Sequence, residues 1–143
     1  MAFATMTPEE LTQKFERCAD WQQRYRYLIE MGRKVPPLAD IFKTDEHKVT
    51  GCMSQVWLVN TSEDPELLMF EADSDAAIVK GLIAVVLIVY SGKSPREIVQ
   101  TDLDGIFSGL GLDKHLSPNR RNGFYSMVIR IKQLAVEHAM ANG

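Results

Sequence analysis

Apolar side chains near the start of the chain recur at the spacing of two amphipathic helices. Thr7-Pro8-Glu9-Glu10 is typical of a helix start, since Thr caps the first turn, Pro suits the first helical position and Glu10 completes a capping box. We expect this helix to end near Arg17, and we expect Asp20 to cap a second one. Gly32 and Pro36-Pro37 indicate the end of the second helix. The core-facing positions are Leu11, Phe15, Trp21, Tyr25, Leu28 and Ile29.

The middle of the chain changes from helical spacing to short β-type segments. Residues 38–48 have no clear period and predict a loop. Residues 55–60 are aromatic and β-branched, as strands prefer, and 67–72 make a further strand after a turn rich in Ser, Asp and Pro. With 47–50 as a first strand, we expect a small antiparallel meander of about three strands. Cys52 then lies in the connection between the first two.

Residues 74–90 are apolar almost all round. The period alone fits a buried strand or a buried helix, but strands seldom exceed ~10 residues, so the length favours a helix. Asp73-Ser74-Asp75 supports this choice, because it would place capping oxygens and negative charge at the positive end of the helix. The segment therefore predicts a buried central helix.

The last third of the chain predicts more helices. Ser94-Pro95-Arg96-Glu97 is a second capping box and opens a short helix through Val99. Residues 106–110 predict one further helical turn, and Ser117-Pro118 opens the last helix. Its apolar face consists of Phe124, Met127, Val128, Ile131, Leu134 and Ala135. The order of elements predicts one α+β domain over residues 1–143, with the meander packed between N- and C-terminal helices and the buried central helix.

Composition and charge narrow the class of function. The 143 residues are 45% hydrophobic and 24% charged, which suits a single domain with a real core. The formal net charge is −3 without a block of Lys and Arg, which argues against nucleic acid or an anionic membrane surface as partner. The longest uncharged run, 81–92, is too short for the ~20 residues of a membrane span. The N-terminus lacks the pattern of a signal peptide, so we expect a soluble, cytoplasmic protein.

The two cysteines, Cys18 and Cys52, are too far apart in sequence for a CxxC redox motif. Cys52 follows Gly51 in a predicted turn and precedes polar residues, whereas a buried structural cysteine would occupy an apolar periodic position. A glycine beside it lets the backbone bend and a partner approach. From the local sequence, a reactive thiol and a cysteine that happens to lie at a strand end are equally tenable. Cys18 is best interpreted as a half-buried small hydrophobe.

The histidines and the C-terminal arginines supply weaker candidates. His47, His115 and His138 do not combine with Cys52 into the spacing of a zinc site, so we expect no metal. A Cys–His nucleophilic pair stays a minority alternative. Arg120 and Arg121 fall in the first turn of the last helix, where positive charge opposes the helix dipole. This position is compatible with a functional role, with simple solvation, or with a bridge to a residue such as Asp113.

Three sequence blocks together resemble the SufE family, the sulfur-acceptor proteins that partner cysteine desulfurases. They are Gly51-Cys52-Met53-Ser54-Gln55-Val56-Trp57, Asp73-Ser74-Asp75-Ala76-Ala77-Ile78-Val79-Lys80-Gly81-Leu82 and Leu116-Ser117-Pro118-Asn119-Arg120-Arg121-Asn122-Gly123. The resemblance spans about residues 7–138, nearly the whole chain. It implies an α+β fold shared with NifU-type cluster scaffolds.

The resemblance also implies a function and two site residues. The persulfide-forming cysteine of the family falls on Cys52, and its C-terminal-helix arginine falls on Arg120. Arg121-Asn122 departs from the usual pattern and leaves the role of Arg121 open. The implied partners are a cysteine desulfurase, which holds the pyridoxal phosphate (PLP), and a downstream sulfur acceptor or cluster scaffold. The chain itself would be a carrier and activator without a cofactor, and not an enzyme.

Three other functions compete with that of a sulfur carrier. A cluster scaffold needs about three or four ligating residues, usually cysteines, and two distant cysteines argue against it. A partner-binding module and a cysteine-based thiol enzyme stay as alternatives.

Carrier chemistry suits a cysteine near an arginine. Lowering a thiol pKa from ~8.5 to ~7 raises the thiolate fraction at neutral pH roughly 15-fold.

Overall fold

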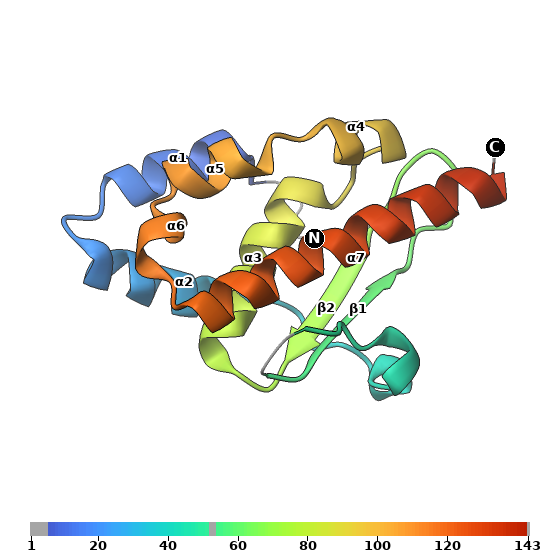
Figure 1. Ribbon diagram of the computed structural model, residues 1–143, viewed down its shortest axis with the longest axis horizontal. Helices are drawn as coiled ribbons and strands as arrows, with labels where there is room; N and C mark the ends of the chain where they lie inside the picture. Colours follow the sequence, from blue (N-terminus) through green and yellow to red (C-terminus); the bar gives the residue numbers. More distant parts are fainter. Residues whose placement is uncertain (1–5, 52–53, 143) are drawn as a thin grey trace.

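The computed structural model describes residues 6–51 and 54–142, and it has the mixed helix and sheet architecture expected of an α+β domain (Figure 1). Helices precede and follow one antiparallel pair of strands, and the described chain ends on a long helix. The elements are α1 Pro8–Glu16, α2 Trp21–Lys34, η2 Asp40–Phe42, η3 Asp45–His47, β1 Val56–Asn60, β2 Phe70–Ser74, α3 Ala77–Tyr90, α4 Pro95–Gln100, α5 Leu103–Gly109, α6 Leu112–His115 and α7 Pro118–Asn142.

Helix α3 is the centre of the core, as its all-round apolar sequence predicts. Nearly all of its residues from Gly81 onward are buried, and it packs against α2, β2 and α7. Figure 1 shows α7 running across the molecule in front of α3. None of the helices in the described part of the chain combines the length and the apolar character that a membrane span requires.

The start of α3 differs from the prediction. Asp73 and Ser74 belong to β2 and do not cap the helix; its N-cap is Ala76, without a side-chain hydrogen bond. The hydroxyl of Ser74 accepts from the Ala76 N–H at 3.3 Å, and the carboxylate of Asp73 accepts from the Ser74 N–H. The sequence pattern of a cap is thus present, but the carboxylates of Asp73 and Asp75 bind groups from distant parts of the chain.

Two glycines let α2 and α3 approach closely. A Cβ on Gly81 would lie 2.5 Å from the backbone O of Leu28, and one on Gly32 would lie 2.6 Å from the backbone N of Gly81. Real side chains do not tolerate such distances, so both positions need a hydrogen in place of a methyl group. The helix ends at Lys34, between Gly32 and Pro36-Pro37 as predicted, and Gly32 has a second role in helix packing that the sequence did not indicate.

The predicted meander of about three strands contains two in the described residues. β1 and β2 pair antiparallel in a register that places Val56 opposite Ser74 and Trp57 opposite Asp73. The expected first strand reduces to one bridge, Lys48 with Trp57, because the chain before it forms the 3-10 helices η2 and η3. The expected loop over 38–48 is thus partly helical.

Local capping signals fix the C-terminal helices. Ser94 and Glu97 form the predicted capping box at α4, and the Ser117 hydroxyl accepts from the Arg120 N–H at 3.3 Å at the start of α7. The single turn predicted over 106–110 is the longer α5, and Gly111, at φ 76°, leads from it into α6. The expected apolar stripe of α7 faces the core: Phe124, Met127, Val128, Ile131 and Ala135 are buried, and Leu134 is partly buried against them.

Candidate functional site around the Cys52 segment

Cys52 and Met53 lie outside the described residues, and the residues on both sides of them form hydrogen bonds with neighbouring elements. The Val49 N–H donates to the Val56 carbonyl at 2.8 Å, which closes a loop over residues 50–55. After the pair, the Gln55 N–H donates to the Asp75 carboxylate at 3.1 Å. The turn between β2 and α3 therefore holds the exit of the loop.

The entrance of the loop is held against α7. Gly51 has φ 88°, in the left-handed region that favours glycine, and a Cβ there would lie 2.6 Å from the Ser126 hydroxyl oxygen. The positive φ favours glycine, and any larger side chain there would also have to displace the Ser126 hydroxyl. The glycine beside Cys52 was expected to let the backbone bend, and the contact with Ser126 adds a reason that the sequence alone did not reveal.

Beside the loop is a cavity of about 410 Å³ between α3 and the start of α7. Its walls are mostly apolar, and polar groups stand at Ser54, Ser117, Asn119 and Arg120. The apolar lining residues are Val56, Ala76, Ile78, Val79, Leu82, Phe124 and Met127. The cavity thus joins Arg120 to Ser54, two residues after Cys52, and offers an apolar lining with one cationic side chain.

The two arginines at the start of α7 have different surroundings. Arg120 is exposed and lines the cavity, and it forms no ion pair with another side chain in the described ranges. Arg121 is half-buried, and its guanidinium donates to the Asp113 carbonyl at 3.1 Å. A contact between Arg121 and Asp113 was one of the alternatives from the sequence, although the acceptor is the backbone and not the carboxylate.

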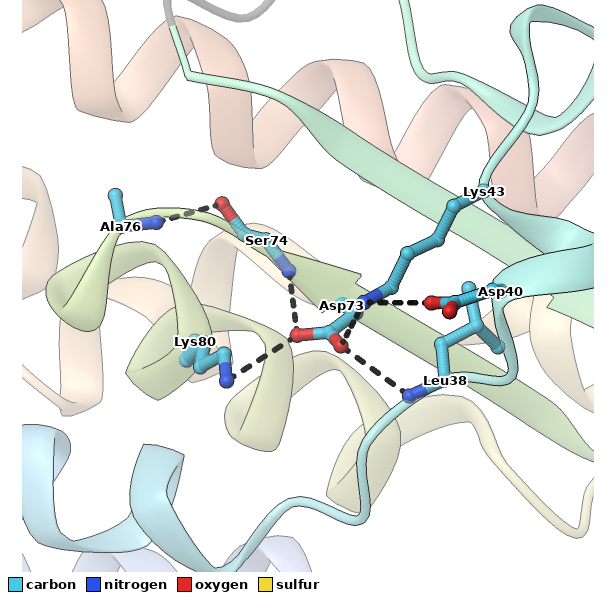
Figure 2. A network of polar contacts seen from close by, with 7 residues as sticks. All are labelled: Leu38, Asp40, Lys43, Asp73, Ser74, Ala76 and Lys80. Carbon is cyan, nitrogen blue, oxygen red and sulfur yellow. Dashed lines mark hydrogen bonds and ion pairs between the residues drawn. The ribbon is translucent and has the colours of Figure 1, made fainter.

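The carboxylate of Asp73 is buried, and Asp73 lies in β2, two residues before Asp75 (Figure 2). Asp73 is 4% exposed and accepts from the N–H groups of Leu38 and Ser74, at 3.2 and 2.8 Å. The ammonium groups of Lys43 and Lys80 lie 3.4 and 3.3 Å from its two oxygens. Burial would raise the pKa of Asp73, but the two backbone N–H groups and Lys80 together hold that pKa below its ordinary value.

The remaining cysteine and the histidines have structural contacts elsewhere. Cys18 is half-buried, as expected, and its sulfur lies 3.5 Å from the Lys14 carbonyl. His47 packs edge-on against Phe42, His115 stacks on Trp21, and His138 lies 2.9 Å from the Asp64 carbonyl. Among the described residues, no group of three or more His, Cys, Asp or Glu side chains is placed to hold a metal ion.

Comparisons with known proteins place the chain in a family. The sequence profile of SufE, described as an Fe-S metabolism associated domain, matches residues 9–135. An uncharacterised SufE-like protein of Rhizobium etli is 50% identical over 136 residues, which cover 93% of this chain and 92% of that protein. Another, from Rhizobium meliloti, is 47% identical over 131 residues, covering 89% and 93%.

A solved structure shares the fold. The solution structure of a hypothetical protein from Thermus thermophilus matches with a TM-score of 0.71 and 22% identity, over 95% of this chain and 99% of that one. At this identity the likeness concerns the fold alone. The family itself rests on the profile and on the two rhizobial proteins, which cover most of the chain. This chain therefore belongs to the SufE family and is associated with iron–sulfur metabolism.

Proposed function

We propose that the chain accepts a sulfur atom on Cys52 from a PLP-dependent cysteine desulfurase, activates that enzyme, and passes the sulfur on for iron–sulfur cluster assembly. The observation that carries the proposal is the cavity shared by Arg120 and Ser54, which lies beside the family's cysteine segment. In this role the chain is a persulfide carrier and not an enzyme. The PLP belongs to the desulfurase, and the acceptor of the sulfur is a downstream protein or cluster scaffold.

The transfer step is an exchange at sulfur. The Cys52 thiolate attacks the terminal sulfur of the desulfurase persulfide, a new S–S bond forms on Cys52, and the desulfurase cysteine leaves as a thiolate. No external oxidant or reductant is needed. A cation near the attacking sulfur favours the thiolate over the thiol, and Arg120 is the cationic side chain on the described wall of the cavity.

The lining of the cavity supports a carrier better than a cysteine hydrolase. A Cys–His hydrolase needs a histidine within hydrogen-bond reach of its nucleophile. The described residues that line the cavity include no histidine. The mostly apolar walls instead suit a persulfide, whose terminal sulfur needs protection from water and from other thiols.

We expect the chain to gain one sulfur atom when it is mixed with a PLP-dependent cysteine desulfurase and cysteine. The gain is about 32 Da by intact mass, reversed by a reducing thiol, because transfer ends in a persulfide on one cysteine. It should persist in Cys18→Ser and vanish in Cys52→Ser. A sulfur gain that follows Cys18, or none with any of several desulfurases, would refute the proposal.

We expect Arg120→Ala to slow sulfur uptake by about tenfold at neutral pH, because the thiolate fraction falls when the nearby cation is lost. The melting temperature should stay within about 2 °C, since Arg120 is exposed. The rate is measured by quenched-flow alkylation and mass spectrometry.

Arg121→Ala is the matched control for Arg120→Ala. The Arg121 guanidinium donates to the Asp113 carbonyl and stabilises the fold at the start of α7. Its loss should lower the melting temperature slightly and leave sulfur uptake unchanged. Equal rates for Arg120→Ala and the wild type would remove Arg120 from the site.

A further inference from the structure

Asp73 connects two regions of the chain that are about 30 residues apart in sequence, 38–43 and 73–80. It lies in β2, it accepts from the backbone of Leu38 after α2, and it contacts Lys80 in the first turns of α3. Its third partner, Lys43, lies between η2 and η3. Figure 2 shows these groups converging on the one carboxylate from opposite sides.

One arm of this network leads to the entrance of the Cys52 loop. Lys43 lies in the segment that continues through η3 to Val49 and Gly51. Its ammonium is also 5.8 Å from the centre of the Trp57 ring, and Trp57 pairs with Asp73 across the two strands. Asp73, Lys43 and Trp57 therefore fix the segment before the loop to the strand that follows it.

The other arm leads to the exit of the loop. The Ser74 N–H donates to Asp73, and the following residue, Asp75, accepts from the Gln55 N–H. By accepting from the Ser74 N–H, Asp73 constrains the backbone immediately before Asp75. Within the described residues, both flanks of Cys52 are thus coupled to the same buried carboxylate.

We propose that Asp73 is a positioning residue for sulfur transfer, which acts by holding both flanks of the Cys52 loop in register with the Arg120 cavity. The proposal rests on the proposed function for its consequence, and on the contacts of Asp73 for its geometry. Asp73 itself does not touch the sulfur. Its role is to hold the described residues on either side of Cys52, at 49–51 and 54–57, in fixed positions relative to each other.

Asp73→Asn tests the geometry without any partner protein. The amide oxygen can replace one carboxylate oxygen, but the charge that attracts Lys43 and Lys80 is lost. By hydrogen–deuterium exchange we expect amides at 49–51 and 54–57 to exchange about tenfold faster, while α4 changes less than twofold. A uniform acceleration across the chain, or none at the loop, would overturn the proposal.

Asp40→Asn is the matched control, because Asp40 is also a partner of Lys43, at 3.8 Å, but its side chain is 99% exposed. It should leave the exchange pattern unchanged. Lys43→Met is a second variant in case Asp73→Asn folds poorly, since it removes one arm and keeps both backbone donors of Asp73. It should accelerate exchange at 49–51 more than at 54–57, and the reverse order would contradict the coupling through two arms.

A kinetic measurement separates positioning from docking. With the desulfurase held constant, we expect Asp73→Asn to lower the maximal rate of sulfur uptake about tenfold and to change the half-saturating concentration less than twofold. A raised half-saturating concentration with an unchanged maximal rate would assign Asp73 to partner binding and overturn its positioning role. If the wild type takes up no sulfur while the exchange pattern is as expected, the proposed function fails but the structural coupling stands.

Discussion

Cys52→Ser is expected to abolish the stimulation of a partner cysteine desulfurase, leaving its turnover at the rate measured without this chain. A serine hydroxyl is scarcely ionised at neutral pH and cannot form a disulfide-type bond with the transferred sulfur. The desulfurase persulfide then persists until another acceptor removes the sulfur, so turnover is not accelerated. Turnover is followed as alanine formed from cysteine, at a concentration of this chain that saturates the wild type.

Cys18→Ser is the control for this loss. Cys18 lies at the end of α1 with its sulfur near the Lys14 carbonyl, and its replacement should leave stimulation intact. The alternatives to a carrier make different forecasts. If the chain were a partner-binding module, the Cys52→Ser variant would still stimulate the desulfurase fully. If it were a cysteine-based thiol enzyme, it would catalyse a Cys52-dependent reaction in the absence of any desulfurase. Either result would displace the carrier proposal.

The helices that were predicted well have strong local signals. Thr7 accepts from the Glu10 N–H and Asp20 from the Gln23 N–H, as their positions before the apolar repeats indicated. Ser94 and Ser117 act in the same way in the second half of the chain. Such caps involve residues three positions apart, so they are visible in the sequence without knowledge of the fold.

The errors occur where a distant partner decides the role of a residue. Asp73 has the local pattern of a cap, but Leu38 and Lys43 reach it from another part of the chain. Gly32 correctly indicated that α2 ends nearby, at Lys34, but the close approach of α3 to this glycine was not predicted. Neither partner can be identified from the segment itself, because each contact depends on the packing of separate elements.

The candidate site was predicted in part. Arg120 and the Cys52 segment were identified through the family resemblance, and the structure places Arg120 and Ser54 on one cavity. The anchors of the loop were missed, because the local pattern indicates Asp75 only as a cap and does not indicate Ser126 at all. Gly51 was the one sequence signal for these anchors. The local sequence around Gly51 does not reveal that it contacts α7. The chemical roles of Cys52 and Arg120 stay predictions.

Gly81→Ala is expected to destabilise the fold by about 2 kcal/mol, with no direct effect on sulfur chemistry. Alanine gains about 1 kcal/mol over glycine inside a helix. The added methyl group, however, would meet the Leu28 carbonyl at 2.5 Å, and this is backbone of a neighbouring helix that cannot turn aside. Overpacking of this kind costs up to about 3 kcal/mol, so the clash outweighs the helix propensity. For a chain of this size we expect a melting temperature about 5 °C lower.

Gly109→Ala is the matched control, because this glycine ends α5 and a Cβ there would have nothing within 4 Å. The same substitution should therefore stabilise the chain, by about 0.5 kcal/mol, since it restricts the unfolded state without a clash. Differential scanning calorimetry of the two variants gives opposite signs if the α2–α3 contact decides the outcome. A stabilised Gly81→Ala would mean that the two helices can separate at little cost, and that the close approach of Gly32 and Gly81 is not needed for stability.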